Sequence, residues 1–105
     1  MTTLQVLVPT TQNIEHEGNI VVRSHLKGNI HCEGALIVEV DASVHGEVHV
    51  ASAQIFGTVK GFLEVRERVI FTDNSYFEGI LDATSLVCSA KTTLIGEIRV
   101  TPNKR

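Results

Sequence analysis

The chain has 105 residues, which is the size of one domain. Its formal net charge of −3 and its 5% content of aromatic residues, with no Trp, argue against a basic or base-stacking surface for nucleic acid. No apolar run approaches the roughly 18 to 20 residues of a membrane-spanning helix, and the N-terminus lacks the pattern of a secretory signal. We therefore expect one cytoplasmic domain with two reduced cysteines.

Residues 1–13 form the expected N-terminal flank. Four apolar residues precede Pro9 in this flank: Leu4, Val6, Leu7 and Val8. Two interpretations stay open. In the first, the segment contacts a membrane weakly and gains strength when many copies lie along a polymer. In the second, it forms a strand that pairs with the first repeat and seals that end.

One short pattern then recurs along the chain: an apolar residue, any residue, Gly, any residue, an apolar residue, any residue, and an apolar or small residue. The copies occupy residues 26–32, 44–50, 59–65, 77–83 and 94–100. Their glycines, at positions 28, 46, 61, 79 and 96, are separated by 18, 15, 18 and 17 residues. A weaker copy at residues 16–22 precedes them, with Gly18 at the glycine position. Repeats of this length cannot bury an apolar face alone, so they must stack.

A second short strand follows each copy. Alternation predicts inward-facing pairs at Leu36 and Val38, Ala53 and Ile55, Val69 and Phe71, and Leu86 and Cys88. The pattern predicts an all-β, single-domain parallel β-helix of about five coils over residues 14–100, with a C-terminal tail at residues 101–105. A β-sandwich is the alternative. Its hairpins favour Asn-Gly or Asp-Gly turns, and neither dipeptide occurs.

The two ends of a β-helix expose unpaired backbone groups and uncovered core side chains. Solenoids normally cover such ends with an atypical repeat, and the sequence has no helical cap at either end of the repeats. We therefore predict end-to-end contacts between copies of the chain. The predicted N-terminal contact residues are Ile14, Ile20 and Val22, and the predicted C-terminal ones are Phe77, Leu94, Ile98 and Val100.

Apolar residues also stand between the inward positions of the second strands. Ile37, Ile70 and Val87, with Phe56 nearby, form an outward apolar stripe, which is typical of a lateral or partner-binding face. If the register is shifted by one residue, the faces exchange and these side chains belong to the core. Both interpretations stay open.

Five histidines and two cysteines raise the question of a metal site or a disulfide. His31 and His49 fall in one outward column, but His45 lies about 13 Å from His49 along the strand, too far to share a metal ion. About three coils, roughly 14 Å, separate Cys32 from Cys88, too far for a disulfide. We predict no metal, no cofactor and no catalytic residue.

The left-handed β-helix of hexapeptide acyltransferases is the enzymatic alternative. A step of 18 residues equals three hexads, but the fifth place of each hexad requires a small residue and here holds Ile30 and Leu36. The 15-residue step also interrupts the run of hexads. We therefore predict that the chain is not an enzyme.

The repeats resemble those of the bactofilins, a family of bacterial polymer-forming cytoskeletal proteins. Residues 26–42, LKGNIHCEGALIVEVDA, look like one of the family's coils, and VHGEVHV, VKGFLEV, FEGILDA and LIGEIRV look like its successors. The resemblance implies a right-handed β-helix that assembles into nucleotide-independent, non-polar filaments, often at the inner face of the cell membrane. It also implies a scaffold role in cell shape, cell-wall synthesis or polar organisation.

We therefore predict a bacterial cytoskeletal scaffold that polymerises end to end in the cytoplasm, at the inner face of the cell membrane. The expected partners are other copies of the chain, inner-membrane lipid, and cell-wall or polarity proteins, with no nucleic acid. The alternative is a β-helix adaptor that forms short oligomers and presents an apolar face to a protein partner.

Overall fold

The computed structural model describes residues 3–72 and 74–101, and every regular element in these ranges is a β-strand. All pairings between the strands are parallel. The strands are β1 (Thr3–Val6), β2 (Thr10–Thr11), β3 (Ile14–His16), β4 (Asn19–Val22), β5 (His25–Lys27), β6 (Ile30–Cys32), β7 (Ala35–Val38), β8 (Ser43–Val50), β9 (Ser52–Ile55), β10 (Thr58–Phe71), β11 (Tyr76–Cys88) and β12 (Thr93–Val100).

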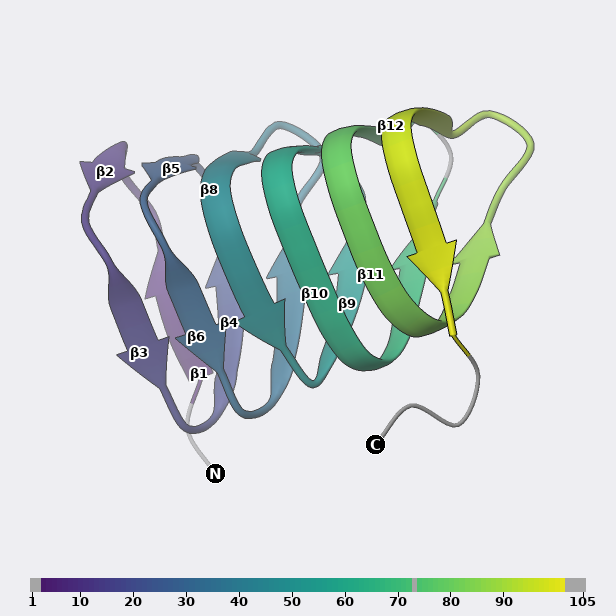
Figure 1. Cartoon of the computed structure of the whole chain (residues 1–105). Coiled ribbons are helices and arrows are strands. Elements are labelled where there is room, and N and C mark those ends of the chain that lie inside the picture. Colours follow the sequence, from purple (N-terminus) through teal and green to yellow (C-terminus); the bar gives the residue numbers. More distant parts are fainter. Residues whose placement is uncertain (1–2, 73, 102–105) are drawn as a thin grey trace.

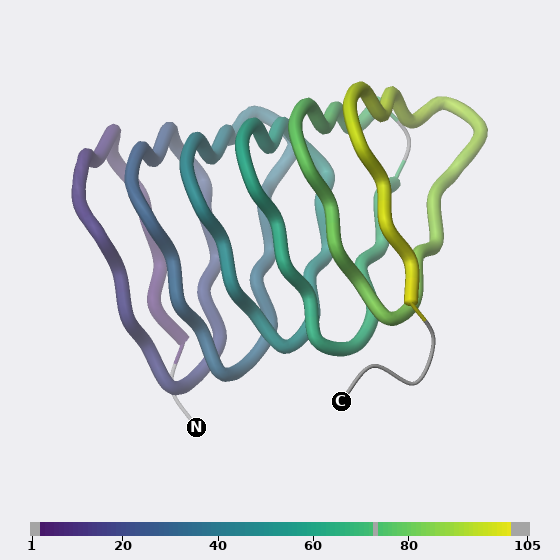
Figure 2. Tube along the Cα trace, in the orientation of Figure 1, coloured from purple at the N-terminus to yellow at the C-terminus, as the bar shows by residue number. Residues whose placement is uncertain are grey.

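The strands wind into a solenoid of about six coils. In Figure 1 the chain descends along the near strands, rises along the far strands and advances toward the C-terminus, which is a right-handed path. Figure 2 shows the same coils stacked along one axis. The predicted parallel β-helix is confirmed. It has about six coils where five were expected, because β1, β2 and β3 together form a first coil.

Each coil contributes one strand segment to each of three faces. The first face consists of β1, β4, β7, β9, residues 68–71 of β10 and residues 85–88 of β11. The second face begins with β2 and β5 and ends with residues 93–95 of β12. The third face begins with β3 and β6 and ends with residues 98–100 of β12.

Inward-pointing side chains stack in columns along the solenoid axis, because successive residues of a strand point to opposite sides. One column on the third face consists of Ile14, Ile30, Val48, Leu63, Leu81 and Ile98. The four members between its ends are fully buried. Burial of each such side chain stabilises the fold by roughly 1.5–3 kcal/mol relative to exposure.

The repeated glycine forms the corner between the second and third faces. The five glycines of this glycine column have φ angles between 119° and 135°, a region that side chains disfavour. A Cβ atom at each of them would overlap the carbonyl oxygen at the same corner of the preceding coil. Backbone conformation and close stacking therefore both require glycine here. The members are Gly28, Gly46, Gly61, Gly79 and Gly96.

The other two corners explain the uneven spacing of the glycines. Between the first and second faces, four residues connect β7 to β8, but only two connect β9 to β10. Between the third and first faces, two residues connect β6 to β7, but only one connects β8 to β9. The 15-residue coil has the short form of both corners, and an 18-residue coil has the long form of both.

The weaker repeat predicted at residues 16–22 is wrong in register. Gly18 does not join the glycine column, because the strand that follows it, β4, pairs with β1 on the first face. The corner of the first coil is Gln12, whose carbonyl oxygen is the group that a Cβ at Gly28 would overlap. Asn13 and Asn29 then follow in register, and the Asn29 N–H donates to Asn13 Oδ1 at 3.0 Å. The true first copy of the repeat is therefore residues 10–16.

Candidate assembly interfaces

The C-terminal end of the solenoid consists of β12 and residues 85–88 of β11, and no strand of the described ranges covers its outer edge. Leu94 and Ile98 point toward the core but remain partly exposed, and Val100 is 42% exposed. Leu81 occupies the same column as Ile98 in the preceding coil, and it is fully buried. This end therefore presents an edge strand together with uncovered aliphatic side chains.

The N-terminal end consists of β1, β2 and β3, and its inward positions are filled differently. Val6 and Ile14 are only 6% and 7% exposed. The register places Thr10 and His16 at inward positions, in columns where all later coils carry apolar residues. The N-terminal end is therefore more polar and better covered than the C-terminal end.

The structure moves three of the predicted contact residues away from the ends. Ile20 and Val22 lie in β4 of the second coil, fully buried and covered by β1. Phe77 lies in β11, fully buried and covered by β12. Their assignment to open ends is corrected, because each is enclosed by a further strand of the same chain. Of the predicted set, Ile14 lies in the first coil, and Leu94, Ile98 and Val100 lie in the last strand.

The apolar residues of the N-terminal flank divide into two pairs. Leu4 and Val6 belong to β1 and pack against the core of the first coil. Leu7 and Val8, at the corner before β2, are 60% and 64% exposed. No helix in the described part of the chain is long and apolar enough to cross a membrane. Within residues 3–13, Leu7 and Val8 are thus the large apolar residues available for an external contact.

The register places one mostly apolar column on the outside of the first face. Its members are Gln5, Val21, Ile37, Gln54, Ile70 and Val87, in chain order. Ile37, Ile70 and Val87 from the predicted stripe therefore share a column, and Phe56 lines a shallow depression with Ile70 and Val87 beside it. Val21 was missed, although its place between the inward residues Ile20 and Val22 was a sufficient signal.

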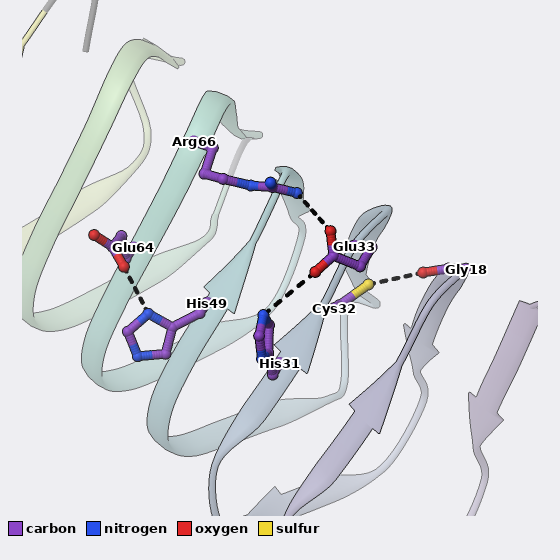
Figure 3. A network of polar contacts seen from close by, with 7 residues as sticks. All are labelled: Gly18, His31, Cys32, Glu33, His49, Glu64 and Arg66. Carbon is purple, nitrogen blue, oxygen red and sulfur yellow. Dashed lines mark hydrogen bonds and ion pairs between the residues drawn. The ribbon is translucent and has the colours of Figure 1, made fainter. Parts of the chain in front are cut away.

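The outer column of the third face carries a polar network, drawn in Figure 3. His31 and His49 are adjacent, with ring centroids 6.4 Å apart, and His49 Nδ1 lies 2.7 Å from Glu64 Oε1. Glu33 bridges His31 Nε2 at 3.5 Å and an Arg66 guanidinium nitrogen at 3.3 Å. Within the described ranges, no three His, Cys, Asp or Glu side chains are arranged to hold a metal ion. These exposed pairs contribute about 0–1 kcal/mol each, so they hold side chains in place more than they stabilise the fold.

The two cysteines occupy contrasting environments, and both are free thiols. Cys32 is buried in β6, where its thiol donates to the Gly18 carbonyl at 2.8 Å (Figure 3). Burial raises the pKa of the Cys32 thiol. Cys88 occupies an inward position of the last coil, in line with Phe71, yet it is exposed. Cys88 is therefore a native chemical marker of the open C-terminal end.

The geometry is that of an open-ended solenoid, with stacked coils and a last strand that no other strand of the described ranges covers. A family model described as "Bactofilin: Polymer-forming cytoskeletal" matches residues 3–99. No curated protein and no solved structure matches the chain. The match covers nearly the whole chain, so the chain belongs to the bactofilin family of polymer-forming cytoskeletal proteins.

Proposed function

We propose that this chain is a structural scaffold that assembles end to end into non-polar filaments without a nucleotide. One observation carries the proposal: the last coil repeats the aliphatic pattern of the interior but leaves its inward side chains partly exposed. Such an end resembles an interior coil from which the next coil has been removed. Contact with another copy supplies the missing cover.

The expected strength of this contact is moderate. Full burial of an aliphatic side chain is worth roughly 1.5–3 kcal/mol, and Leu94, Ile98 and Val100 have already gained part of it within the chain. Backbone hydrogen bonds along β12 add to the contact, and lost translational and rotational freedom opposes it. Burial and backbone hydrogen bonds are the contributions that favour this association, so the proposal requires no nucleotide.

Non-polarity follows if like ends meet. A contact between two C-terminal ends is isologous and joins two copies about a two-fold axis. A filament also requires the N-terminal ends of such pairs to meet, and because both contacts are then isologous, it has no direction. The difference between the ends favours this arrangement, because the apolar C-terminal end matches a second copy of itself better than it matches inward Thr10 and His16.

The cellular role that we propose is support of cell shape, cell-wall synthesis or polar organisation, from filaments in the cytoplasm at the inner face of the membrane. Exposed Leu7 and Val8 support a weak lipid contact, which repetition along a filament would strengthen. The role is structural and includes no catalytic step.

Electron microscopy of the nucleotide-free chain tests this function, with two matched variants. Ile98→Arg places a charge at the inward face of β12, and Ile95→Arg places the same charge on the outward face of the same strand. We expect filaments from the native chain and from Ile95→Arg, and none from Ile98→Arg. Filaments of normal length from Ile98→Arg, or none from the native chain at high concentration, would reject end-to-end assembly through β12.

A second candidate function rests on the outer column of the first face. Its exposed Val87 and half-buried Val21, Ile37 and Ile70 fit an adaptor that forms short oligomers and presents this face to a protein partner. The native chain and Val87→Arg together separate the two functions. An adaptor shows only dimers or short oligomers even as the native chain, whereas a scaffold shows filaments. If the native chain forms filaments, Val87→Arg leaves their length unchanged when the ends alone determine assembly, and shortens them when this face takes part.

A further inference from the structure

The glycine column stops one coil short of the N-terminal end, where Gln12 takes its place. The position is equivalent, because the Gln12 N–H donates to the Lys27 carbonyl at 3.0 Å, as the Gly28 N–H donates to the His45 carbonyl at 2.9 Å. Gln12 nevertheless differs from every later corner in two respects. It has a side chain, and its φ angle is not positive.

Because the glycines of the column have no Cβ, the carbonyl groups of the preceding coil can approach them closely. A Cβ at Gly46 would overlap the Gly28 carbonyl oxygen, and a Cβ at Gly96 would overlap that of Gly79. These carbonyl groups all point toward the C-terminal end of the solenoid. By the same repeat, Gly96 presents its own carbonyl oxygen to any coil that stacks on the C-terminal end.

A head-to-tail contact that continued the solenoid would stack the first coil of one copy on the last coil of another. In such a stack the columns of one copy continue into the next. Ile14 of one copy would then lie next to Ile98 of the other, and Gln12 next to Gly96. The later corners carry only a hydrogen atom beside the carbonyl oxygen of the preceding corner, whereas Gln12 carries a side chain. The corner would also lack the positive φ that the other corners share. A close-packed backbone does not adapt to a corner of different shape without disturbing the coils around it.

One feature favours the head-to-tail contact, since Arg99 would lie beside Glu15 in the outer column of the third face. Both side chains are exposed, and an exposed ion pair of this kind changes affinity by a factor of a few. The mismatch between this corner and the backbone of the last coil outweighs it. We propose that Gln12 blocks head-to-tail stacking and thereby restricts assembly to contacts between like ends, an inference that rests on the proposed end-to-end assembly.

The test is a cross-linking experiment on the full chain that detects contacts between unlike ends. Native Cys88 marks the C-terminal end. Gln5→Cys in a Cys88→Ser background marks the N-terminal end, because Gln5 is exposed in β1 and would lie one coil, about 5 Å, from Val87 in a head-to-tail stack. The two chains, made different in mass by a tag, are mixed before assembly and treated with a short bis-maleimide.

With Gln12 in both chains, we expect no more cross-linked heterodimer than in a control in which both chains also carry Ile98→Arg and do not assemble. Gln12→Gly in both chains should raise the yield about tenfold or more, whereas Gln12→Ala, which keeps a Cβ, should not. Unchanged melting temperatures show that the variants are folded. A heterodimer formed with native Gln12, or no gain with Gln12→Gly, would overturn the proposal. The increase in cross-linked heterodimer with Gln12→Gly requires only that two unlike ends meet, and it does not require native filaments. Absence of native filaments would therefore reject the proposed function, whereas the cross-linking yield tests the role of Gln12 separately.

Discussion

Ile14 and Ile98 stand at opposite ends of one inward column, and they receive different cover. Ile14 is 7% exposed, whereas Ile98 remains partly exposed. The N-terminal end departs from the repeat at Thr10 and Gln12, but the C-terminal end keeps the aliphatic pattern to its last strand. A solenoid end is therefore better covered where its repeat is altered, and it leaves core side chains more exposed where the repeat is kept.

The largest effect is expected at the glycine corner between the second and third faces, which is compared between an interior coil and the first coil. Gly79→Ala should lower the free energy of unfolding by more than about 2 kcal/mol, because the methyl group meets the Gly61 carbonyl and φ is +135°. Gln12→Ala, at the same corner of the first coil, should change it little. Urea denaturation measures both. Equal effects would show that the two corners are not different environments.

Substitution of three isoleucines in one column by alanine measures how strongly each position is buried by its neighbours. Ile30→Ala should cost about 2–5 kcal/mol of unfolding free energy, because Ile30 is fully buried between two coils. Ile14→Ala should cost somewhat less. Ile98→Ala should cost least in the unassembled chain.

Denaturation at low protein concentration, where chains are separate, gives these values. Repeating it with assembled protein should increase the cost of Ile98→Ala and leave that of Ile30→Ala unchanged. If Ile98→Ala is already as costly as Ile30→Ala in the separate chain, the C-terminal end is covered within one chain and the two ends do not differ in the way described.

A smaller effect is expected from the exposed pair beside the N-terminal end. The double substitution Leu7→Ser and Val8→Ser should reduce co-sedimentation of filaments with liposomes, since it removes apolar surface from a weak contact that is repeated along the filament. Val40→Ser is the matched control, because Val40 is equally exposed at a corner between the same two faces. Unchanged binding by the double variant would remove the lipid contact from the account.

The smallest effect concerns the polar column of the third face. His49→Ala breaks the 2.7 Å contact with Glu64, and because both side chains are partly exposed, we expect a loss below about 1 kcal/mol. Urea denaturation and filament length should both stay near native values. A large loss of filaments would show that this face, and not only the ends, takes part in assembly.

Much of the fold was predictable because the repeat carries it. Glycine at a corner, followed by alternating apolar residues, is a local pattern that fixes both strand and inward face, and this pattern predicted the parallel β-helix. The first coil was not found, since it lacks that glycine and reads Thr10 and Gln12 where later coils read an aliphatic residue and glycine. Its register follows from pairing with β4, β5 and β6 of the second coil.

The ends were predictable only in part, for the same reason. Placing the first coil at residues 16–22 made Ile20 and Val22 appear terminal, whereas β1 covers both. At the other end the pattern runs to the last strand, so Leu94, Ile98 and Val100 were found in the place where the structure has them. How strongly a terminal side chain is covered depends on neighbours from other coils, which no single repeat contains.

The most direct test of the open C-terminal end is the alkylation rate of Cys88, with Cys32 in the same chain as an internal control. Cys32 should react slowly in every state, because it is buried and its raised pKa delays thiolate formation to higher pH. Cys88 should react quickly in the non-assembling Ile98→Arg chain and several times more slowly in native filaments. Equal Cys88 rates in the two samples, with filaments present, would show that the C-terminal end is not where copies join.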